Sequence, residues 1–252
     1  MASIGILGLG EAGGAIASDL RAAGASVRGF DPDPATKPDA PDTEAAVAGA
    51  QLVLSLTTAA EALTAARAAA RALRRGQVYA DANTSGAALK RAVAEVVEPA
   101  GAVFADVALM APVPGRGIST PALASGSGAA AAAEILRPLG MPVTVLDAEP
   151  GAAATRKLLR SVAWKGTAAV VCEALAAARA AGLEDWMRGE LLGLLSSADE
   201  GTLARMEDGS RRHAVRRAHE MQEVGALLRE LGVTPHMSDA ARAQLEEMQR
   251  RG

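Results

Sequence analysis

The sequence predicts a doubly wound, mostly parallel α/β domain followed by an all-helical C-terminal domain. In the first half of the 252 residues, short apolar runs of strand length alternate with helical patterns, which is typical of βαβ units around a parallel sheet. After Asp147 the alternation stops, and only helical patterns follow. The chain is also longer than a typical single domain of about 100–200 residues. We therefore expect two domains, residues 1–149 and 150–252, with the boundary near Pro150 and Gly151.

The first half contains the strands of the predicted sheet. The expected strands are Ser3–Leu7, Ser26–Phe30, Gln51–Leu56, Val78–Asp81, Val103–Val107, Ala122–Ser125 and Pro142–Leu146. The expected helices between them are Glu11–Ala23, Ala59–Arg75, Gly86–Val97 and Ala129–Leu136. Gly24 and Gly76 follow two of these helices directly, where a glycine commonly ends a helix. The segment Pro112–Thr120 is rich in proline and glycine and is predicted to form a loop.

The second half is predicted to contain helices alone. The expected helices are Ala152–Ala181, Trp186–Ser196, His213–Leu231 and Ser238–Arg250. The first has no proline and a single internal glycine, Gly166, so it is predicted to run unbroken. Cys172 lies near Val170 and Leu175 on this helix, and we expect its thiol in the core. Another set of apolar residues is expected in the core or on a dimer surface, namely Leu227, Leu228 and Leu231.

Composition limits the classes of function. The formal net charge of -3 argues against a dedicated nucleic-acid-binding protein, which usually carries a basic excess. The single cysteine excludes an internal disulfide and a cysteine-based metal cluster. Met1–Leu7 lacks the basic start of a signal peptide, and no apolar run is long enough to span a membrane. We therefore expect a cytoplasmic protein with no bound metal and no membrane partner.

A glycine-rich turn follows the first expected strand directly. It matches the pattern G-x-G-x-x-G with Gly8, Leu9, Gly10, Glu11, Ala12 and Gly13. In a Rossmann domain the first glycine permits a tight turn, the second lets the backbone approach a pyrophosphate, and the third lets the helix pack closely on the strand. The position between a strand and a helix predicts a nicotinamide dinucleotide site at the start of the helix. The alternative is a glycine-rich turn that binds nothing.

Asp31 predicts that the cofactor is NAD rather than NADP. In Rossmann domains an acidic residue about 20 positions after the glycines, at the end of the second strand, binds the ribose hydroxyls. Asp31 occupies this position, and its carboxylate would repel the 2′-phosphate of NADP. Arg28 is close in sequence and keeps NADP open as the alternative cofactor.

Small polar residues follow the next two expected strands. Leu56, Thr57 and Thr58 come at the end of the third strand, and Asn83 and Thr84 come after the fourth. Ligands of open α/β sheets bind at the carboxyl ends of the strands. We therefore expect both segments near the second ribose and the carboxamide of the cofactor. Asn83 and Thr84 also suit capping of the helix that follows them.

With these motifs the chain resembles the β-hydroxyacid dehydrogenases, the family of 3-hydroxyisobutyrate and 6-phosphogluconate dehydrogenases. The resemblance covers essentially the whole chain and is closest to a branch with a phosphogluconate-dehydrogenase-like C-terminal domain. It is carried by the glycine-rich turn, residues 81–85, 106–114 and 213–221, and Lys157. The resemblance implies an NAD(P)-dependent dehydrogenase of a small hydroxy acid, with a homodimer as the assembled form.

The resemblance also implies that Lys157 is the general acid/base. In the family pattern G-x-x-G-x-x-x-K-x-x-x-N, this chain has Ala153 in place of the second glycine and Ser161 in place of the asparagine. The loop that reads S-G-G in relatives and binds the substrate carboxylate is here Met110, Ala111 and Pro112. These departures concern the substrate rather than the cofactor.

A lysine accepts a hydroxyl proton only when its amine is neutral. Its usual pKa of about 10.4 must therefore fall through burial and a neighbouring cation. On the expected helix, Ser161 lies one turn beyond Lys157 and Trp164 two turns beyond, on the same face. We expect Ser161 to hydrogen-bond the substrate and Trp164 to form a wall of its pocket, with Lys165 as the second candidate for the acid/base. The alternative is that Lys157 lies on an ordinary solvent-exposed basic turn.

Two basic segments are weaker candidates. Arg116, between two glycines, suits either binding of a substrate carboxylate or phosphate, or the role of an ordinary exposed loop residue. The arginines and histidines of residues 211–219 suit a substrate site, although an exposed charged face of a helix is the favoured interpretation.

Two other functions share these features. An imine reductase has the same architecture but generally a different residue at the position of Lys157. A nucleotide-binding protein without turnover would keep the glycine-rich turn, and the changed residues Ser161 and Met110–Pro112 are compatible with it. The leading prediction is hydride transfer between NAD and a small hydroxy acid.

Overall fold

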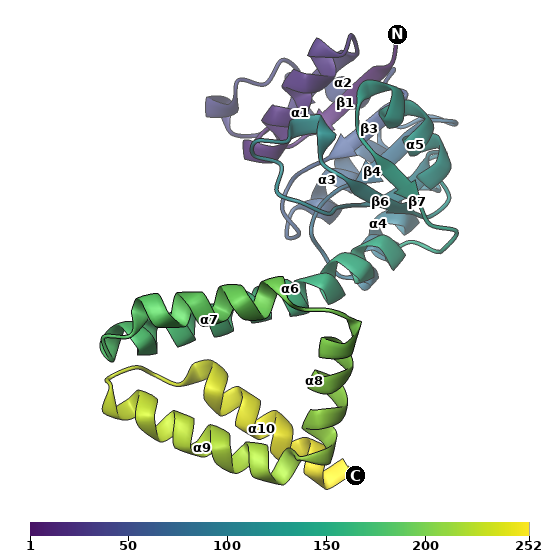
Figure 1. Cartoon of the computed structure of the whole chain (residues 1–252). Helices are drawn as coiled ribbons and strands as arrows, with labels where there is room; N and C mark the ends of the chain where they lie inside the picture. Colours follow the sequence, from purple (N-terminus) through teal and green to yellow (C-terminus); the bar gives the residue numbers. More distant parts are fainter. Residues whose placement is uncertain (252) are drawn as a thin grey trace. The chain divides into compact units, whose positions relative to one another are not determined.

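The computed structural model describes residues 1–251, and the chain divides into two compact units, Met1–Arg160 and Ser161–Gly252. The first unit is a sheet covered by helices, and the second consists of helices (Figure 1). The predicted fold class is therefore confirmed. The predicted domain boundary between residues 149 and 150 stays a prediction.

The sheet of the first unit has seven strands in the order β2-β1-β3-β4-β5-β6-β7. The strands are β1 (Ser3–Leu7), β2 (Ser26–Phe30), β3 (Leu52–Ser55), β4 (Val78–Asp81), β5 (Val103–Leu109), β6 (Ala122–Ser125) and β7 (Val143–Val145). The strands β1 to β5 pair in parallel, whereas β6 pairs antiparallel with β5 and β7 pairs parallel with β6. Because β2 and β3 lie on opposite sides of β1, the strand order reverses there, and open α/β sheets bind ligands at such a switch point.

Helices cover both faces of this sheet. They are α1 (Glu11–Ala22), α2 (Thr43–Val47), α3 (Ala62–Ala70), α4 (Ala87–Val97) and α5 (Ala129–Leu136). One core contains Ile16 and Leu136, from α1 and α5, and the core on the other face contains Ala66 and Val93, from α3 and α4. The short helix α2 was not predicted, and the helix predicted at α3 extended into the turns at both of its ends. All seven predicted strands are present, but β3 ends at Ser55, β5 at Leu109 and β7 at Val145 rather than at the predicted residues.

The helix α6 (Ala152–Ala180) begins in the first unit and continues into the second. The second unit also contains α7 (Glu184–Ser196), α8 (Glu200–Arg212), α9 (Ala214–Glu230) and α10 (His236–Arg251). The helices α9 and α10 pack together as a hairpin (Figure 1). The helix α8 was not predicted, because its sequence contains two glycines, Gly201 and Gly209, which disfavour a helix, and few apolar residues that would indicate a buried face. Asp199 caps its start by accepting a hydrogen bond from the Thr202 N–H.

Large apolar side chains of the second unit are exposed. Trp164 is 76% exposed, Leu192 68% and Leu203 67%. The predicted core position of Cys172 is wrong, since its thiol is exposed. Val170, two residues earlier on α6, is also exposed, so this stretch of the helix lacks the covering layer that the prediction assumed.

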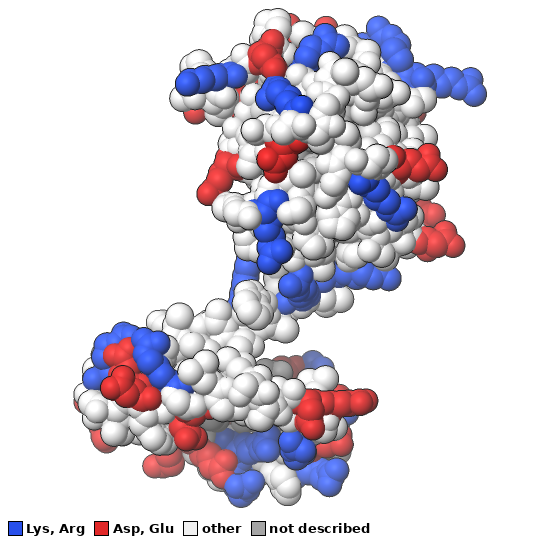
Figure 2. All heavy atoms as spheres, turned by 45° about the horizontal axis from the view of Figure 1, so that its top comes forward, with Lys and Arg blue, Asp and Glu red and all other residues white. Residues whose placement is uncertain are grey.

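Charged side chains of both signs are interspersed over each unit on the face shown in Figure 2. Such a mixture agrees with the small net charge of -3. Within residues 1–251, no helix has both the length and the apolar character that crossing a membrane requires.

Candidate functional site

The glycine-rich turn between β1 and α1 has a backbone that requires its glycines. Gly8 has a φ of 91°, in the left-handed region, and a Cβ there would lie 2.5 Å from the Leu56 carbonyl oxygen. A Cβ on Gly13 would lie 1.9 Å from the Gly8 carbonyl oxygen. At Gly10, by contrast, an added Cβ would meet no heavy atom of the described chain within 4 Å. The turn is therefore tight on the protein side and open on the other.

This open side fits a pyrophosphate. Among the described residues, no side chain caps the start of α1. The first N–H groups of a helix have no partner inside the helix, and together they carry a partial positive charge. An anion placed beside Gly10 would receive these N–H groups, which is the arrangement that the G-x-G-x-x-G pattern predicts.

Asp31 lies at the carboxyl end of β2 and contacts this turn directly. Its Oδ2 accepts a hydrogen bond from the Leu9 N–H at 2.7 Å, and its Oδ1 accepts one from the Asp33 N–H at 2.9 Å. An ionised carboxylate has about four acceptor sites, so sites remain for ribose hydroxyls. The Arg28 guanidinium donates to the Ala48 carbonyl oxygen, and Arg28 does not line the cavity beside Asp31 among the residues described.

Two cavities lie along the carboxyl edge of the sheet. The larger, of about 580 Å³, is lined by residues that include Gly8, Gly10, Glu11, Asp31 and Thr58. The smaller, of about 220 Å³, is lined by residues that include Asn83, Thr84, Ala111 and Lys157. Ala12, Leu56 and Thr57 line both cavities, so the two adjoin. Together they form a track that suits an elongated ligand with one end at Asp31 and the other near Lys157.

The structure brings Lys157 to Thr84. The Lys157 Nζ donates a hydrogen bond to Thr84 Oγ1 at 2.9 Å, beside the smaller cavity. Asn83 donates from its side-chain nitrogen to Ser55 Oγ and accepts from Thr57 Oγ1. The prediction that Asn83 and Thr84 cap helix α4 is wrong. The N-cap residue of α4 is Gly86, and no side chain in the described chain caps the helix there. Both residues instead belong to the polar lining of the cavity.

A buried lysine between two buried aspartates lies beneath this lining, and the sequence analysis missed it. Lys90 on α4, Asp81 at the end of β4 and Asp106 on β5 all have fully buried side chains. The Lys90 Nζ lies 3.4 Å from Asp81 Oδ1 and 3.3 Å from Asp106 Oδ1, and it donates to the Asp81 carbonyl oxygen at 2.7 Å. Burial raises the pKa of the Asp81 carboxyl, and the positive charge of Lys90 partly offsets this increase.

A signal for Lys90 was present in the sequence. On helix α4, Lys90 lies three, four and seven positions before Val93, Ala94 and Val97, which are all buried. A lysine at these spacings belongs to the inward face of the helix. A buried lysine requires a carboxylate partner. Asp81 ends the apolar strand β4, and Asp106 lies within the apolar strand β5.

The other predicted substrate residues lie in different environments. The Arg160 guanidinium donates to the Met110 carbonyl oxygen, Ala111 lines the smaller cavity, and Pro112 is exposed. Arg116 is exposed beside a short 3-10 turn, Gly117–Ser119. Further along α6, the roles of three residues in the second unit stay predictions: Ser161, Trp164 and Lys165.

The basic segment of residues 211–219 is an exposed charged surface. Arg211 pairs with Glu207, Arg212 with Asp208, and Arg216 with Glu220, each four positions apart. His213 separates α8 from α9. Ion pairs at this spacing are typical of a solvent-exposed helix surface.

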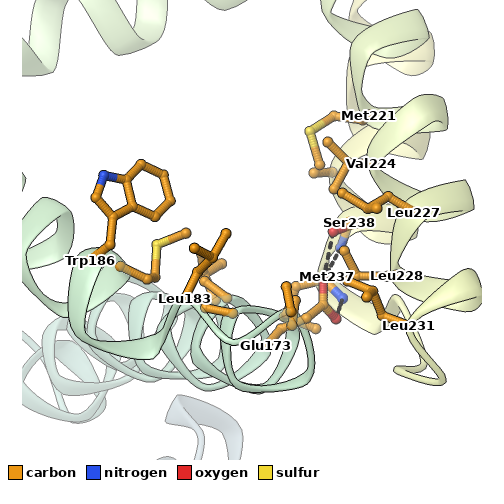
Figure 3. Close-up of a pocket in the computed structure, with 17 residues that line it drawn as sticks. Glu173, Leu183, Trp186, Met221, Val224, Leu227, Leu228, Leu231, Met237 and Ser238 are labelled. Atoms are coloured by element: carbon orange, nitrogen blue, oxygen red, sulfur yellow. Dashed lines mark hydrogen bonds between the residues drawn. The ribbon is translucent and has the colours of Figure 1, made fainter.

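The second unit has an apolar pocket of its own, of about 520 Å³. Leu183, which precedes α7, and Trp186 of α7 lie on one side of it, and Met221, Val224 and Leu227 of α9 lie on the other (Figure 3). Glu173 lies at its edge and accepts hydrogen bonds from the Met237 and Ser238 N–H groups and the Ser238 hydroxyl. Burial opposes the charge of Glu173, but the hydrogen bonds from Ser238 and Met237 outweigh it and lower the pKa of this carboxyl.

Metal-ligand clusters are absent from the described part of the chain, since no three His, Cys, Asp or Glu side chains within residues 1–251 are grouped to hold a metal ion.

Comparison with protein families gives two matches. Residues 3–145 match the family described as the NAD binding domain of 6-phosphogluconate dehydrogenase. Residues 178–248 match a domain of unknown function, DUF1932. The predicted resemblance is confirmed in both halves of the chain.

Comparison with solved structures gives relatives over nearly the whole chain. A conserved hypothetical protein from Sinorhizobium meliloti is 30% identical, with a TM-score of 0.64 over 98% of this chain and 88% of that chain. A conserved protein of unknown function, described as structurally similar to 3-hydroxyacid dehydrogenases, is 29% identical, with a TM-score of 0.64 over 98% of each chain. An imine reductase from Myxococcus stipitatus in complex with NADP+ is 20% identical and shares the fold, with a TM-score of 0.79 over 100% of this chain and 95% of that chain. Among curated proteins, none matches the sequence.

Proposed function

Because the chain belongs to the family with the NAD binding domain of 6-phosphogluconate dehydrogenase, we propose that it transfers a hydride between NAD and a small hydroxy acid. The observation that carries the proposal is the position of Lys157. Its Nζ lies 2.9 Å from Thr84 Oγ1 beside the cavity of about 220 Å³. That cavity adjoins the one at the glycine-rich turn, so a proton-transfer group lies at the end of a track that suits a dinucleotide.

The residues of the glycine-rich turn and of the strand ends would hold the cofactor. The N–H groups that open α1 would bind the pyrophosphate, Asp31 the adenosine ribose, and Thr57 and Asn83 the nicotinamide half. When bound, the nicotinamide supplies the hydride chemistry. The fit rests on the open space beside Gly10 and on the two adjoining cavities.

Lys157 handles the proton of the reaction. In the oxidative direction the neutral amine accepts the proton of the substrate hydroxyl, and in the reductive direction the ammonium returns it. Thr84 accepts a hydrogen bond from Lys157 and thereby directs the amine toward the cavity. The Thr84 hydroxyl also has its own proton to donate to a substrate oxygen.

We propose NAD as the cofactor because the end of the track beside β2 is acidic. Asp31 lines the cavity and Asp33 donates its N–H to the Asp31 carboxylate, so a 2′-phosphate there would meet negative charge. The test is the ratio of kcat/KM values for NAD and NADP, which we expect to favour NAD by at least about tenfold, or about 1.4 kcal/mol. A preference for NADP would contradict the assignment.

The substrate class is tested by following NADH absorbance with two panels of compounds. We expect turnover with small hydroxy acids and none with cyclic imines in the reverse direction. Turnover with cyclic imines alone would identify an imine reductase, whose fold this chain shares. NAD binding by calorimetry without turnover on either panel would favour a nucleotide-binding protein that has no catalytic role.

We also propose that the chain forms a homodimer through its second unit. Large apolar side chains exposed there include Trp164, Trp186, Leu192 and Leu203, and exposed apolar surface of this kind is common at interfaces between proteins. Sedimentation equilibrium at micromolar concentration tests this proposal. We expect the mass of two chains, and the mass of one chain would contradict it.

A further inference from the structure

The buried lysine and its two aspartates connect the two sides of the Lys157–Thr84 contact. We infer that Lys90, Asp81 and Asp106 form a positioning device that holds the Lys157 amine against Thr84 in the smaller cavity. The three residues touch neither the cavity nor the dinucleotide track among the lining residues described. Their role is therefore to place other groups rather than to react. The inference rests on the proposed function for its catalytic meaning, but the contact itself is tested separately below.

The first arm of the device runs from Asp106 to the start of α6. The Asp106 Oδ2 accepts hydrogen bonds from the Gly151 and Ala154 N–H groups, each at 3.0 Å, and from the Ser125 hydroxyl at 3.2 Å. The Ser125 oxygen in turn accepts the Ala153 N–H at 3.1 Å. A carboxylate at the N-terminal end of a helix also interacts favourably with the helix dipole. The first turn of α6 is thus tied to β5 and β6, and Lys157 lies one turn further along.

The second arm runs from Asp81 to the loop that carries Thr84. The Asp81 Oδ1 accepts the Asn83 N–H at 2.8 Å, and the Asp81 carbonyl oxygen accepts a hydrogen bond from the Lys90 Nζ at 2.7 Å. These contacts fix the backbone of the loop immediately before Thr84. The same lysine faces Asp106 at 3.3 Å. One ammonium group therefore links the loop of Thr84 to the helix of Lys157.

The linkage explains why a charge is buried at this place. A buried ion pair contributes little net stability compared with apolar residues of similar volume, because desolvation opposes the attraction. A cation between two carboxylates does, however, specify where two backbone segments lie. Here the two segments are the ones that carry the Lys157 amine and the Thr84 hydroxyl.

The first test is the variant Asp106→Asn in the full chain. The amide has one oxygen and one NH₂ group, so it cannot accept from α6 and face the Lys90 ammonium with oxygen at the same time. We expect kcat to fall by at least tenfold while the KM for NAD stays within twofold, and the pH profile of kcat to shift. A matched control is Gln77→Leu at the opposite end of β4, because the Gln77 side chain donates to the Val47 and Ala50 carbonyl oxygens in the core. We expect this control to lower the melting temperature and leave kcat unchanged.

A second variant applies if Asp106→Asn does not fold. Lys90→Met/Asp81→Asn removes one positive and one negative charge, so the formal charge of the cluster is unchanged. It keeps the Asp106 contacts with α6 and removes the link, so we expect a smaller fall in kcat than for Asp106→Asn. If either variant lowers the melting temperature as Gln77→Leu does but leaves kcat and its pH profile unchanged, the three residues have only a structural role and the inference is wrong.

The contact is also tested without any substrate. An amine-selective acylating reagent, followed by peptide mass spectrometry, reports how accessible and reactive each lysine amine is. In Asp106→Asn we expect the labelling rate of Lys157 to change several-fold and that of the exposed Lys37 to stay the same. Equal rates at Lys157 in the variant and the parent protein would overturn the inference. If the rate changes but the parent protein turns over no compound, the proposed function fails and the positioning device stands.

Discussion

The two units of this chain treat charge and apolar surface in opposite ways. In the first, Lys90, Asp81 and Asp106 are fully buried and paired at the carboxyl edge of the sheet. In the second, ion pairs such as Arg211–Glu207 lie at the surface, whereas Trp164 and Leu203 are exposed to solvent. The contrast indicates that the first unit builds a polar site from its own residues. The second unit leaves large apolar side chains exposed in the described chain.

The largest expected effect is on catalysis in the first unit. The variant Lys157→Ala removes the proposed proton-transfer group, and general acid–base catalysis contributes about 10²- to 10⁴-fold. We expect kcat to fall within this range while the Kd for NAD, measured by calorimetry, is unchanged. The exposed Arg91 on α4 provides a control, since Arg91→Ala removes a surface cation without touching the smaller cavity. Turnover near that of the parent protein would exclude Lys157 from the mechanism.

The next effect concerns cofactor binding. At Gly10 the φ is -59°, outside the left-handed region that favours glycine, and a Cβ there meets nothing in the described chain within 4 Å. Gly10→Ala should therefore fold normally but place a methyl group where we propose that the pyrophosphate binds. We expect the Kd for NAD to rise by about tenfold or more, or about 1.4 kcal/mol.

The matched control for Gly10→Ala is Gly189→Ala on α7. Gly189 likewise has no heavy atom of the described chain within 4 Å of an added Cβ, but it lies in the second unit. We expect no change in the Kd for NAD and a gain of up to about 1 kcal/mol in stability from helix propensity. Equal effects on the Kd in the two variants would refute the placement of the cofactor.

A smaller expected effect is a difference between the two units in how their stability depends on pH. The pKa of Glu173 is lowered in the fold, so its stabilising contribution is present above the unfolded pKa and is lost as pH falls through the folded pKa. The pKa of Asp81 is raised mainly by burial, so the fold favours the neutral form of this carboxyl. Protonation of Asp81 on acidification therefore does not lower the stability of the first unit. We expect hydrogen-exchange protection to fall first in α10 and later in β4 as the pH is lowered from neutral.

The variant Glu173→Gln sharpens this pH experiment. An amide retains only one oxygen to accept the hydrogen bonds from Met237 and Ser238, and a hydrogen bond to a charged group is worth about 1.5–3 kcal/mol. We expect lower protection of α10 at neutral pH and little further loss on acidification. Protection in α10 that falls with pH equally in both proteins would show that another group is responsible.

The smallest expected effect is at Cys172. Its thiol is exposed in the described chain, and substitutions at exposed positions usually change stability by less than about 0.5 kcal/mol. We therefore expect Cys172→Ser to leave the free energy of unfolding, measured by urea denaturation, within that limit. A larger cost would show that this side of α6 is covered in solution.

Much of the cofactor end was predictable because its signals are local. The pattern from Gly8 to Gly13 and the position of Asp31 follow from the backbone needs of a tight turn and from the length of one βα unit. The strands Ser3–Leu7, Val78–Asp81 and Ala122–Ser125 have the predicted bounds, since each is a short apolar run with clear turns beside it. The site that these elements build is still a proposal.

The parts that were missed depend on distant contacts. Asp106 accepts hydrogen bonds from residues 45 and 48 positions away in the chain. No periodic pattern in the sequence predicts contacts over such a separation. The helix α8 lacks an apolar stripe from which a helix could be predicted. Cys172 has apolar neighbours in the sequence but no covering layer in the described chain, so a local pattern predicted burial where the fold leaves exposure.

The distribution of the aromatic side chains separates the two units optically. The two tryptophans of the chain, Trp164 and Trp186, both lie in the second unit and are 76% and 57% exposed. The single tyrosine, Tyr79, is buried in β4 of the first unit. Indole fluorescence therefore reports on the helical unit alone, and its emission colour would reveal whether the two rings leave water when chains associate. Changes in the sheet would not alter that signal, so the folding of the helical unit can be followed by itself without adding a label.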